Sequence, residues 1–322
     1  TNNILKKSLL SSVFFVILVV IVFYFVFKDL GFKYVLILFK NSNKLYLIIA
    51  VFCMASYSFL EGLNVKIILK SLGNKIKYSA CYKYAVGSFF TASITPSSSG
   101  GDPMAIFLMA RDKLPVSHSA ITLLTKLMCY QIVVLSLSLI SFITTYKQTM
   151  NLLGNMKFLV FLGLFLNMLV FSLYFLAIFF KQIMVFLVDL LCKLLYKLHF
   201  KKAKSLEEKI HIQIEEYGSA ALILKNNKKI VLKVVLVTLV QIIIFYSIPY
   251  FVYLALGYHE TSIIKFITTQ AILYVAVSAL PFPGAVGISE AVFMKLYKTL
   301  FNPLVLGSAM FITRFINFYL FV

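Results

Sequence analysis

Residues 91–107 read TASITPSSSGGDPMAIF and lie between apolar runs. From Pro96 to Pro103 they hold two prolines, three serines, two glycines and Asp102. No helix can continue through this octapeptide, because proline lacks the backbone N–H and clashes with the preceding turn, and paired glycines have low helical propensity. Non-helical backbone survives at membrane depth only where it is buried in protein or lines a watery cavity. The break therefore raises the question of a functional site inside a membrane.

The composition predicts an integral membrane protein. The chain is 61% hydrophobic and 13% charged, with 32 Phe and 19 Tyr, and its mean hydropathy is +0.95. Residues 8–27 carry no charge and can span about 30 Å as a helix. This run is too long for a signal-peptide core and lacks a cleavage site, so we expect an uncleaved first span. Because the sequence starts without Met and stops inside an apolar run, we expect trimming at one or both ends.

The charge of the chain fits a membrane partner and argues against nucleic acid. The net charge is +20, and all but two of the 31 cations are lysines. Basic loops favour the cytoplasmic face and attract anionic lipid headgroups, whereas no basic-aromatic motif of a nucleic-acid module is present. The cysteines and histidines have no metal-ligand spacing, so we expect no metal, disulfide or cofactor.

Apolar runs long enough for helices recur along the chain, which predicts an all-α, polytopic bundle. The runs are 45–63, 118–146, 157–180, 230–256, 263–280 and a last one from 304. Residues 28–44 were expected to be a lysine-bearing loop. Residues 181–229 carry ten lysines with apolar residues at helical spacing. This pattern predicts that residues 181–229 form a connector on the cytoplasmic side, with an amphipathic helix on the membrane and a further helical part.

A second break, PFPGAVG at 281–287, repeats the pattern of the first. Each break has a Ser three places before a Pro, a glycine-containing turn, and a carboxylate that opens a short apolar helix. Paired interruptions of this kind point to a binding site between structural repeats. Tight loops at the bilayer surface are the alternative, but the flanking segments are too short to span, which favours re-entrant hairpins. The backbone candidates are Pro96, Ser97, Ser98, Ser99, Gly100, Gly101, Pro281, Pro283, Gly284 and Gly287.

We therefore predict one transmembrane domain over 1–322 with two pseudo-symmetric halves. The first half covers 1–180 with its break at 96–103, and the second covers 230–322 with its break at 281–287. Two helix N-termini aimed at one cavity would suit an anionic headgroup.

Five charged residues near the breaks are the candidate headgroup site: Asp102, Arg111, Lys126, Glu290 and Arg314. A charge at mid-bilayer costs at least ~2.5–3.5 kcal/mol, so it is a functional candidate by default. The two arginines carry a planar fork that binds phosphate bidentately. Other roles stay open, since the two acids could cap their own helices and Arg111 could snorkel to an interface. For Glu61 we prefer a position at the headgroups to a role in the site.

These residues resemble the transmembrane domain family of lysylphosphatidylglycerol synthase/flippase (multiple peptide resistance factor) and its stand-alone relatives. The resemblance covers nearly the whole chain and rests on FFTASITPSSSGGDPMAIFLMAR, the Lys126 segment, and LPFPGAVGISEAVFMKLY with Arg314 downstream. The more specific motif, P-x-P-G-x-x-G-x-x-E, matches Pro281, Pro283, Gly284, Gly287 and Glu290. This chain departs from the family at Lys126 and Asp102, where relatives more often carry Arg and Glu, and at Ala285, where a Gly is common.

The resemblance implies a flippase-like domain with two inverted halves, re-entrant helices and a cavity for a lipid headgroup. The expected substrate is an anionic or aminoacylated phospholipid, such as lysylphosphatidylglycerol, or a polyprenyl-phosphate-linked lipid. The expected location is the bacterial cell membrane, with a homodimer as one open arrangement. We expect no enzyme activity, because the residues contain no soluble aminoacyl-transferring domain, and no ATP motor, because no phosphate-binding loop motif occurs. A headgroup-modifying enzyme with Asp102 or Glu290 as general base, or a lipid-binding protein that moves nothing, are the alternatives.

Overall fold

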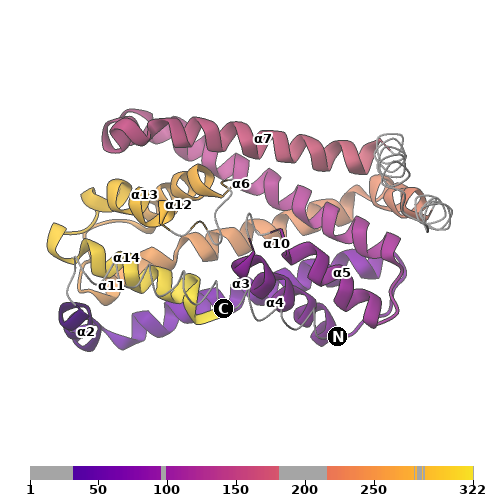
Figure 1. Ribbon diagram of the computed structural model, residues 1–322, viewed down its shortest axis with the longest axis horizontal. Coiled ribbons are helices and arrows are strands. Elements are labelled where there is room, and N and C mark those ends of the chain that lie inside the picture. Colours follow the sequence, from indigo (N-terminus) through magenta and orange to yellow (C-terminus); the bar gives the residue numbers. More distant parts are fainter. Residues whose placement is uncertain are drawn as a thin grey trace, which may run out of the picture.

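The computed structural model describes residues 32–95, 99–180, 216–278, 280, 285 and 287–321. Every regular element in these ranges is a helix or a short 3-10 turn (Figure 1). The expected first span at 8–27 and connector residues 181–215 lie outside the described residues. Six of the backbone candidates do too, namely Pro96, Ser97, Ser98, Pro281, Pro283 and Gly284.

The helices match the apolar runs of the sequence and show a multi-pass membrane protein. Four stretches are long and apolar enough to cross a bilayer: Lys44–Ser71, Val116–Phe179, Lys228–Ala255 and Pro303–Phe321. The helices are α2 (Phe32–Asn41), α3 (Lys44–Ser71), α4 (Tyr78–Ile94), α5 (Gly101–Arg111), α6 (Val116–Leu153), α7 (Lys157–Phe179), α10 (Lys228–Tyr246), α11 (Ile248–Ala255), α12 (Ile263–Val277), α13 (Ile288–Leu296) and α14 (Pro303–Asn317).

The stretch Val116–Phe179 is a hairpin of two long helices. Gly154, with a φ of 51°, ends α6, and the chain turns back into α7. The rings of Phe142 and Phe161 lie 5.6 Å apart, and Gln131 donates to the Asn167 carboxamide oxygen at 2.8 Å. The pair nearer to Gly154 in sequence is Phe142–Phe161, and the pair farther from it is Gln131–Asn167. This order shows that α6 and α7 are antiparallel.

The first sequence break is the tip of a second hairpin, formed by α4 and α5. Near the tip, Gly101 packs so closely on Ala92 that an added Cβ would lie 3.0 Å from the Ala92 Cβ. At the other end, the Tyr84 hydroxyl donates to Asp112 at 2.5 Å. The chain therefore enters and leaves on the same side. At about 1.5 Å per residue, neither the 17 residues of α4 nor the 11 of α5 would cross a 30 Å bilayer.

The helices on either side of the second break, α12 and α13, form a corresponding hairpin. Away from the tip, the Tyr297 hydroxyl donates to Gln270 at 2.6 Å, and Phe266 lies 5.9 Å from the Tyr297 ring. At the tip, Gly287 has a φ of 88°, a conformation that favours glycine. With 15 and 9 residues, these two helices are also too short to cross.

The long helices place the two hairpins at opposite ends of the molecule. In Figure 1, α4 and α5 lie at one end, α12, α13 and α14 lie at the other, and α3, α6, α7 and α10 run along the long axis between them. Helix α3 packs on α4, α10 and α11, and α6 contacts both α5 and α12. The long helices therefore form the frame against which both breaks are held.

Two expectations about the loops were wrong. Residues 32–41, expected within a lysine-bearing loop, form α2, whose last turn holds Lys40 at the favourable end of the helix dipole. Helix α3 continues beyond Leu63 to Ser71, and its last turn holds Lys70 at the favourable end of the helix dipole. As a consequence, Glu61 lies inside the helix instead of at its terminus.

Candidate functional site

A cavity of about 330 Å³ lies between the two hairpins and the long helices. Its wall includes residues that flank both sequence breaks, Gly101 and Asp102 on one side and Ala285 and Ser289 on the other. The two breaks thus meet at one cavity although they are far apart in sequence. The polar and charged lining residues are Tyr57, Ser58, Glu61, Ser88, Ser93, Asp102, Lys126, Tyr130, Gln270, Tyr274, Ser278, Ser289, Thr313, Arg314 and Asn317.

The first cation of the cavity is Lys126, which projects from α6. Its Nζ donates to Glu61 Oε1 of α3 at 2.6 Å, and the two side chains are only 7% and 18% exposed. A lone charge in this apolar setting is costly, and the pair removes much of that cost. The helix register that places Lys126 opposite Glu61 therefore makes both charges tolerable within the bundle.

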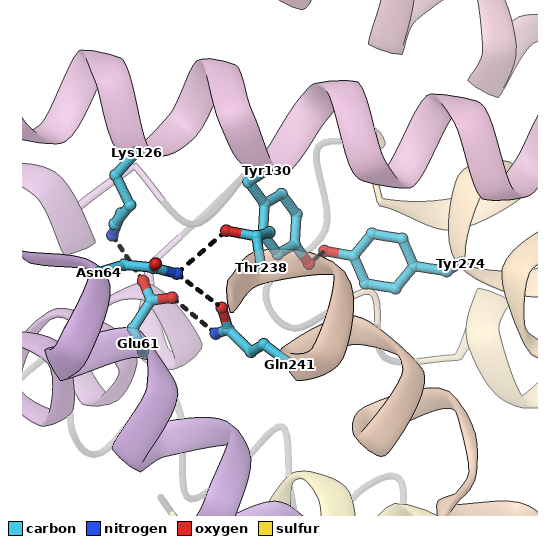
Figure 2. Close-up of polar contacts among 7 residues, drawn as sticks. All are labelled: Glu61, Asn64, Lys126, Tyr130, Thr238, Gln241 and Tyr274. Carbon is cyan, nitrogen blue, oxygen red and sulfur yellow. Dashed lines mark hydrogen bonds and ion pairs between the residues drawn. The ribbon is translucent and has the colours of Figure 1, made fainter. Parts of the chain in front are cut away.

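A chain of neutral polar groups holds Glu61 from its other side (Figure 2). Gln241 of α10 donates from Nε2 to Glu61 Oε2 at 2.7 Å. Asn64 in turn donates to Gln241 Oε1 at 3.2 Å and to the Thr238 hydroxyl at 3.0 Å. Asn64 and Glu61 are one helical turn apart on α3, as Thr238 and Gln241 are on α10, so this network joins the two halves of the chain through the membrane interior.

A pair of tyrosines extends the polar wall toward the second hairpin. The Tyr130 hydroxyl of α6 donates to the Tyr274 hydroxyl of α12 at 2.6 Å, as Figure 2 shows. Both side chains line the cavity. Their apolar rings pack in the bundle while the hydroxyls satisfy each other, as buried tyrosines require.

The second cation of the cavity is Arg314 of α14. Its Nε donates to Glu290 Oε1 at 2.8 Å, and the side chains are 14% and 10% exposed. The other Glu290 oxygen accepts the Gly287 backbone N–H at 2.6 Å and the Ser289 hydroxyl at 2.9 Å. Glu290 therefore caps its own helix α13, which is the alternative role that the sequence left open, and it also pairs with Arg314.

Asp102 opens α5 and lines the cavity. Within the described ranges no side chain lies within ion-pair or hydrogen-bond distance of its carboxylate, although it is close enough to Lys126 to interact with its charge. The two cavity cations thus face three carboxylates, those of Glu61, Glu290 and Asp102. When all are ionised the described part of the site carries one excess negative charge.

Beside Arg314, two buried polar atoms of α14 lack a partner. Thr313 is 1% exposed and Asn317 is 7% exposed, and both line the cavity. No described group bonds to the Thr313 hydroxyl or to Asn317 Oδ1. Because buried polar groups are nearly always hydrogen-bonded, these two atoms are available to a polar ligand or to water in the cavity.

Arg111, the other arginine, lies away from the cavity. It is exposed at the end of α5 and stands 6.0 Å from the Phe107 ring centroid. Nearby, at the base of the hairpin, Asp112 accepts hydrogen bonds from Tyr84 and from Lys83, the latter at 3.0 Å. The Tyr84 hydrogen bond and the Lys83 charge hold the pKa of Asp112 below its ordinary value.

The described backbone candidates lie at the two tips. Ser99 is exposed in the turn, and the Gly100 N–H donates to the Thr95 hydroxyl at 2.9 Å. An added Cβ at Gly100 would lie 2.7 Å from Thr95 Cγ2, so the tip is closely packed. Gly287 stands at the start of α13, next to the cavity.

Sequence reasoning placed Glu61 at the headgroups and missed Asn64 and Gln241, whereas the structure pairs Glu61 with Lys126 and holds it through Gln241 and Asn64. Their signal was present in the sequence, since polar residues recur at helical spacing within otherwise apolar runs. In a membrane such residues face the bundle interior and pair with one another. No group of three His, Cys, Asp or Glu in the described ranges could hold a metal ion.

Comparison with known proteins agrees with this architecture. A model of the family "Lysylphosphatidylglycerol synthase TM region" matches residues 9–322. A "UPF0104 membrane protein" of Archaeoglobus fulgidus is 28% identical over 284 residues, which cover 87% of this chain and 84% of that relative. No solved structure matches the chain at a significant level. The chain is therefore a member of the lysylphosphatidylglycerol synthase transmembrane-region family.

Proposed function

We propose that this protein is a flippase that moves a phospholipid or lipid-linked headgroup between the two leaflets of a bacterial cell membrane. The observation that carries the proposal is one cavity bounded by both hairpin tips and lined by Lys126 and Arg314. Each cation is held by a carboxylate, which a phosphate group can replace. The unpartnered Thr313 and Asn317 atoms beside Arg314 supply further contacts for a polar headgroup.

The charges of the site support an anionic or aminoacylated phospholipid, or a polyprenyl-phosphate-linked lipid. The phosphate would bind Arg314 through its planar fork and Lys126 as a point charge. An amine on the headgroup would bind Asp102, whose carboxylate has no cation within ion-pair distance among the described residues. The acyl chains would stay in the bilayer, and the lipid would cross without a covalent step.

Leaflet exchange in reconstituted vesicles tests this function. Fluorescent phosphatidylglycerol, lysylphosphatidylglycerol and a polyprenyl phosphate would each be placed in one leaflet, and their arrival in the other would be followed. We expect selective exchange by the wild type that is lost in Arg314→Ala and in Glu290→Gln. Arg111→Ala is the matched arginine control, because Arg111 lies outside the cavity and its loss leaves the site intact.

Three results would contradict the proposal. Absence of exchange for every lipid would remove the flippase function. Exchange that survives both cavity variants would place the path elsewhere. A chemical change in the headgroup, detected by mass spectrometry of the recovered lipid, would favour the membrane-embedded enzyme.

A further inference from the structure

The two cation–carboxylate pairs of the cavity differ in how firmly each carboxylate is held. Glu290 accepts hydrogen bonds from Arg314, the Gly287 backbone and Ser289, so it keeps two donors if Arg314 turns to a ligand. Glu61 accepts from Lys126 and Gln241 alone among the described residues. Loss of Lys126 would leave Glu61 with one neutral amide.

A phosphate at Lys126 creates this situation. Lysine has three N–H donors but a single charge, so a phosphate and Glu61 together would place two negative charges on one cation. Asp102, which also interacts with the Lys126 charge, adds a third. A buried carboxylate without a cation is strongly disfavoured, and such groups take up a proton instead.

Among the residues that the structure describes, the surroundings of Glu61 offer no cation other than Lys126. The titratable groups that face the Glu61–Lys126 pair are Tyr57 of α3, Asp102 of α5, Tyr130 of α6, Tyr174 of α7 and Tyr274 of α12. Phenols are neutral near pH 7. Helix α10 contributes neutral Thr238 and Gln241, and the residues of α4 that line the cavity carry no charge. A proton on the Glu61 carboxylate would then balance its charge without any further protein group.

The polar network also contains a hydrogen-bond acceptor, Asn64 Oδ1, that no described group uses. Asn64, fully buried and one turn from Glu61 on α3, donates through its Nδ2 to two partners, whereas its Oδ1 has no partner within the described part of the chain. Figure 2 shows Asn64 and Glu61 in one cluster. A protonated Glu61 is a donor, and this network has room for one.

We propose that Glu61 is a proton-binding site whose occupancy is coupled to phosphate binding at Lys126, so that each lipid crosses together with one proton. This inference rests on the proposed flippase function and names its coupling ion. The Glu61 carboxylate takes one H⁺ to become a carboxylic acid, and a monoanionic phosphate replaces it on Lys126. The net charge of the cavity is the same before and after. Asp102 forms no ion pair with a described residue, whereas Glu61 pairs directly with Lys126. The carboxylate that the phosphate displaces from Lys126 is therefore that of Glu61.

Proton uptake on lipid binding is the first test. Short-chain phosphatidylglycerol would be added to the purified protein in weakly buffered dodecyl maltoside with a pH-indicator dye. Between the pH at which Glu61 titrates in the lipid-free protein and the pH at which it titrates with lipid bound, we expect the wild type to take up about one proton per lipid. Over the same range its Kd should rise toward tenfold per pH unit. Glu61→Gln, which keeps the hydrogen bonds of the acid without a titratable proton, should take up none and bind with a Kd that changes less than about twofold.

Asp112→Asn is the matched control, because it makes a similar carboxylate-to-amide change outside the cavity. It should take up the proton as the wild type does. Uptake retained in Glu61→Gln would overturn the assignment to Glu61. Binding by the wild type without uptake and with a constant Kd would overturn the coupling even if Glu61→Gln failed to fold.

A pH gradient across vesicles separates this inference from the flippase function. Coupled movement should concentrate labelled phosphatidylglycerol in the leaflet that faces the alkaline side, and Glu61→Gln should abolish this asymmetry. Exchange that stays symmetric under a gradient would overturn proton coupling and leave the flippase function in place. No exchange under any condition would remove the flippase function, and this inference with it.

Discussion

The ion pair between Arg314 and Glu290 has two separable effects, one on stability and one on the ligand. In the interior of a bundle, loss of one partner strands the other charge, whereas joint replacement by apolar residues is often neutral or stabilising. Both side chains here are 14% exposed or less. Stability and exchange should therefore respond differently to single and double substitutions.

Arg314→Met should lower the free energy of unfolding by about 3–5 kcal/mol, because it leaves the Glu290 charge without its cation. Adding Glu290→Leu should recover most of this loss, since no buried charge then remains. Neither variant should exchange lipid. Unfolding in detergent and the vesicle assay measure the two effects, and equal instability of the single and double variants would contradict this account of the pair.

The partnerless hydroxyl of Thr313 can be tested in a similar way. Thr313→Val removes a buried polar atom that the empty protein does not satisfy, so stability should hold or rise by about 1 kcal/mol. Exchange should slow about fivefold, the equivalent of one hydrogen bond of ~1 kcal/mol to the headgroup. Initial exchange rates and unfolding midpoints provide the measurements.

Ser308→Ala is the control for this change. Ser308 lies on the same helix and its hydroxyl also lacks a partner among the described residues, but it does not line the cavity. It should share the gain in stability and keep its exchange rate. An equal loss of exchange in both variants would mean that Thr313 acts through α14 and not through the ligand.

Helix α7 approaches α12 very closely at Gly163. A Cβ on Gly163 would lie 2.0 Å from the Val275 carbonyl oxygen and 3.0 Å from Ala276 Cα. Both contacts are with backbone, which cannot rotate away. Small residues at such contacts let membrane helices pack closely, and here the contact fixes the hairpin that carries the second tip.

Gly163→Ala should therefore displace α12 and lower the free energy of unfolding by about 1–3 kcal/mol. Exchange should fall as well, since α12 carries Tyr274 and Val277 of the cavity wall. Ser172→Ala, on an exposed position of the same helix, is the control and should change little. Wild-type stability of Gly163→Ala would show that the two helices have freedom to separate.

Apart from α2, the sequence predicted the long apolar helices that the structure describes and the interruptions between α4 and α5 and between α12 and α13, because each rests on local chemistry. Long apolar runs form helices that span a bilayer, and clusters of proline and glycine interrupt a helix in any surroundings. It failed where the outcome depends on distant contacts. Glu61 was placed at a membrane surface because its partners, Lys126 and Gln241, are 65 and 180 residues away. Which carboxylate meets which cation is set by packing of helices, which local pattern does not contain.

The molecule as a body presents an apolar flank to the membrane. Large hydrophobic residues are exposed along one face of α7 at helical spacing, among them Phe158, Phe161, Phe165, Leu169 and Leu173. In water such a surface would aggregate, whereas acyl chains solvate it. The side chains of the two ion pairs at the cavity, by contrast, are at most 18% exposed.

A tryptophan reporter distinguishes the two environments, and the chain contains no Trp to interfere. Phe165→Trp, at a position 64% exposed on α7, should be quenched strongly by lipids with brominated acyl chains. Phe89→Trp, in the cavity wall, should be quenched several-fold less. Equal quenching at both sites would contradict the enclosed cavity.

The partners of Glu61 are synthesised at different times after Glu61 itself. Lys126 follows Glu61 by 65 residues, but Gln241 follows it by 180. At roughly 5–20 residues per second, Glu61 waits about 3–13 s for its cation and about 9–36 s for its amide. During that interval a charged helix must reside at the insertion machinery or in the lipid without its final partners. The first half of the nascent chain thus gains the full set of Glu61 partners only after α10 has been synthesised.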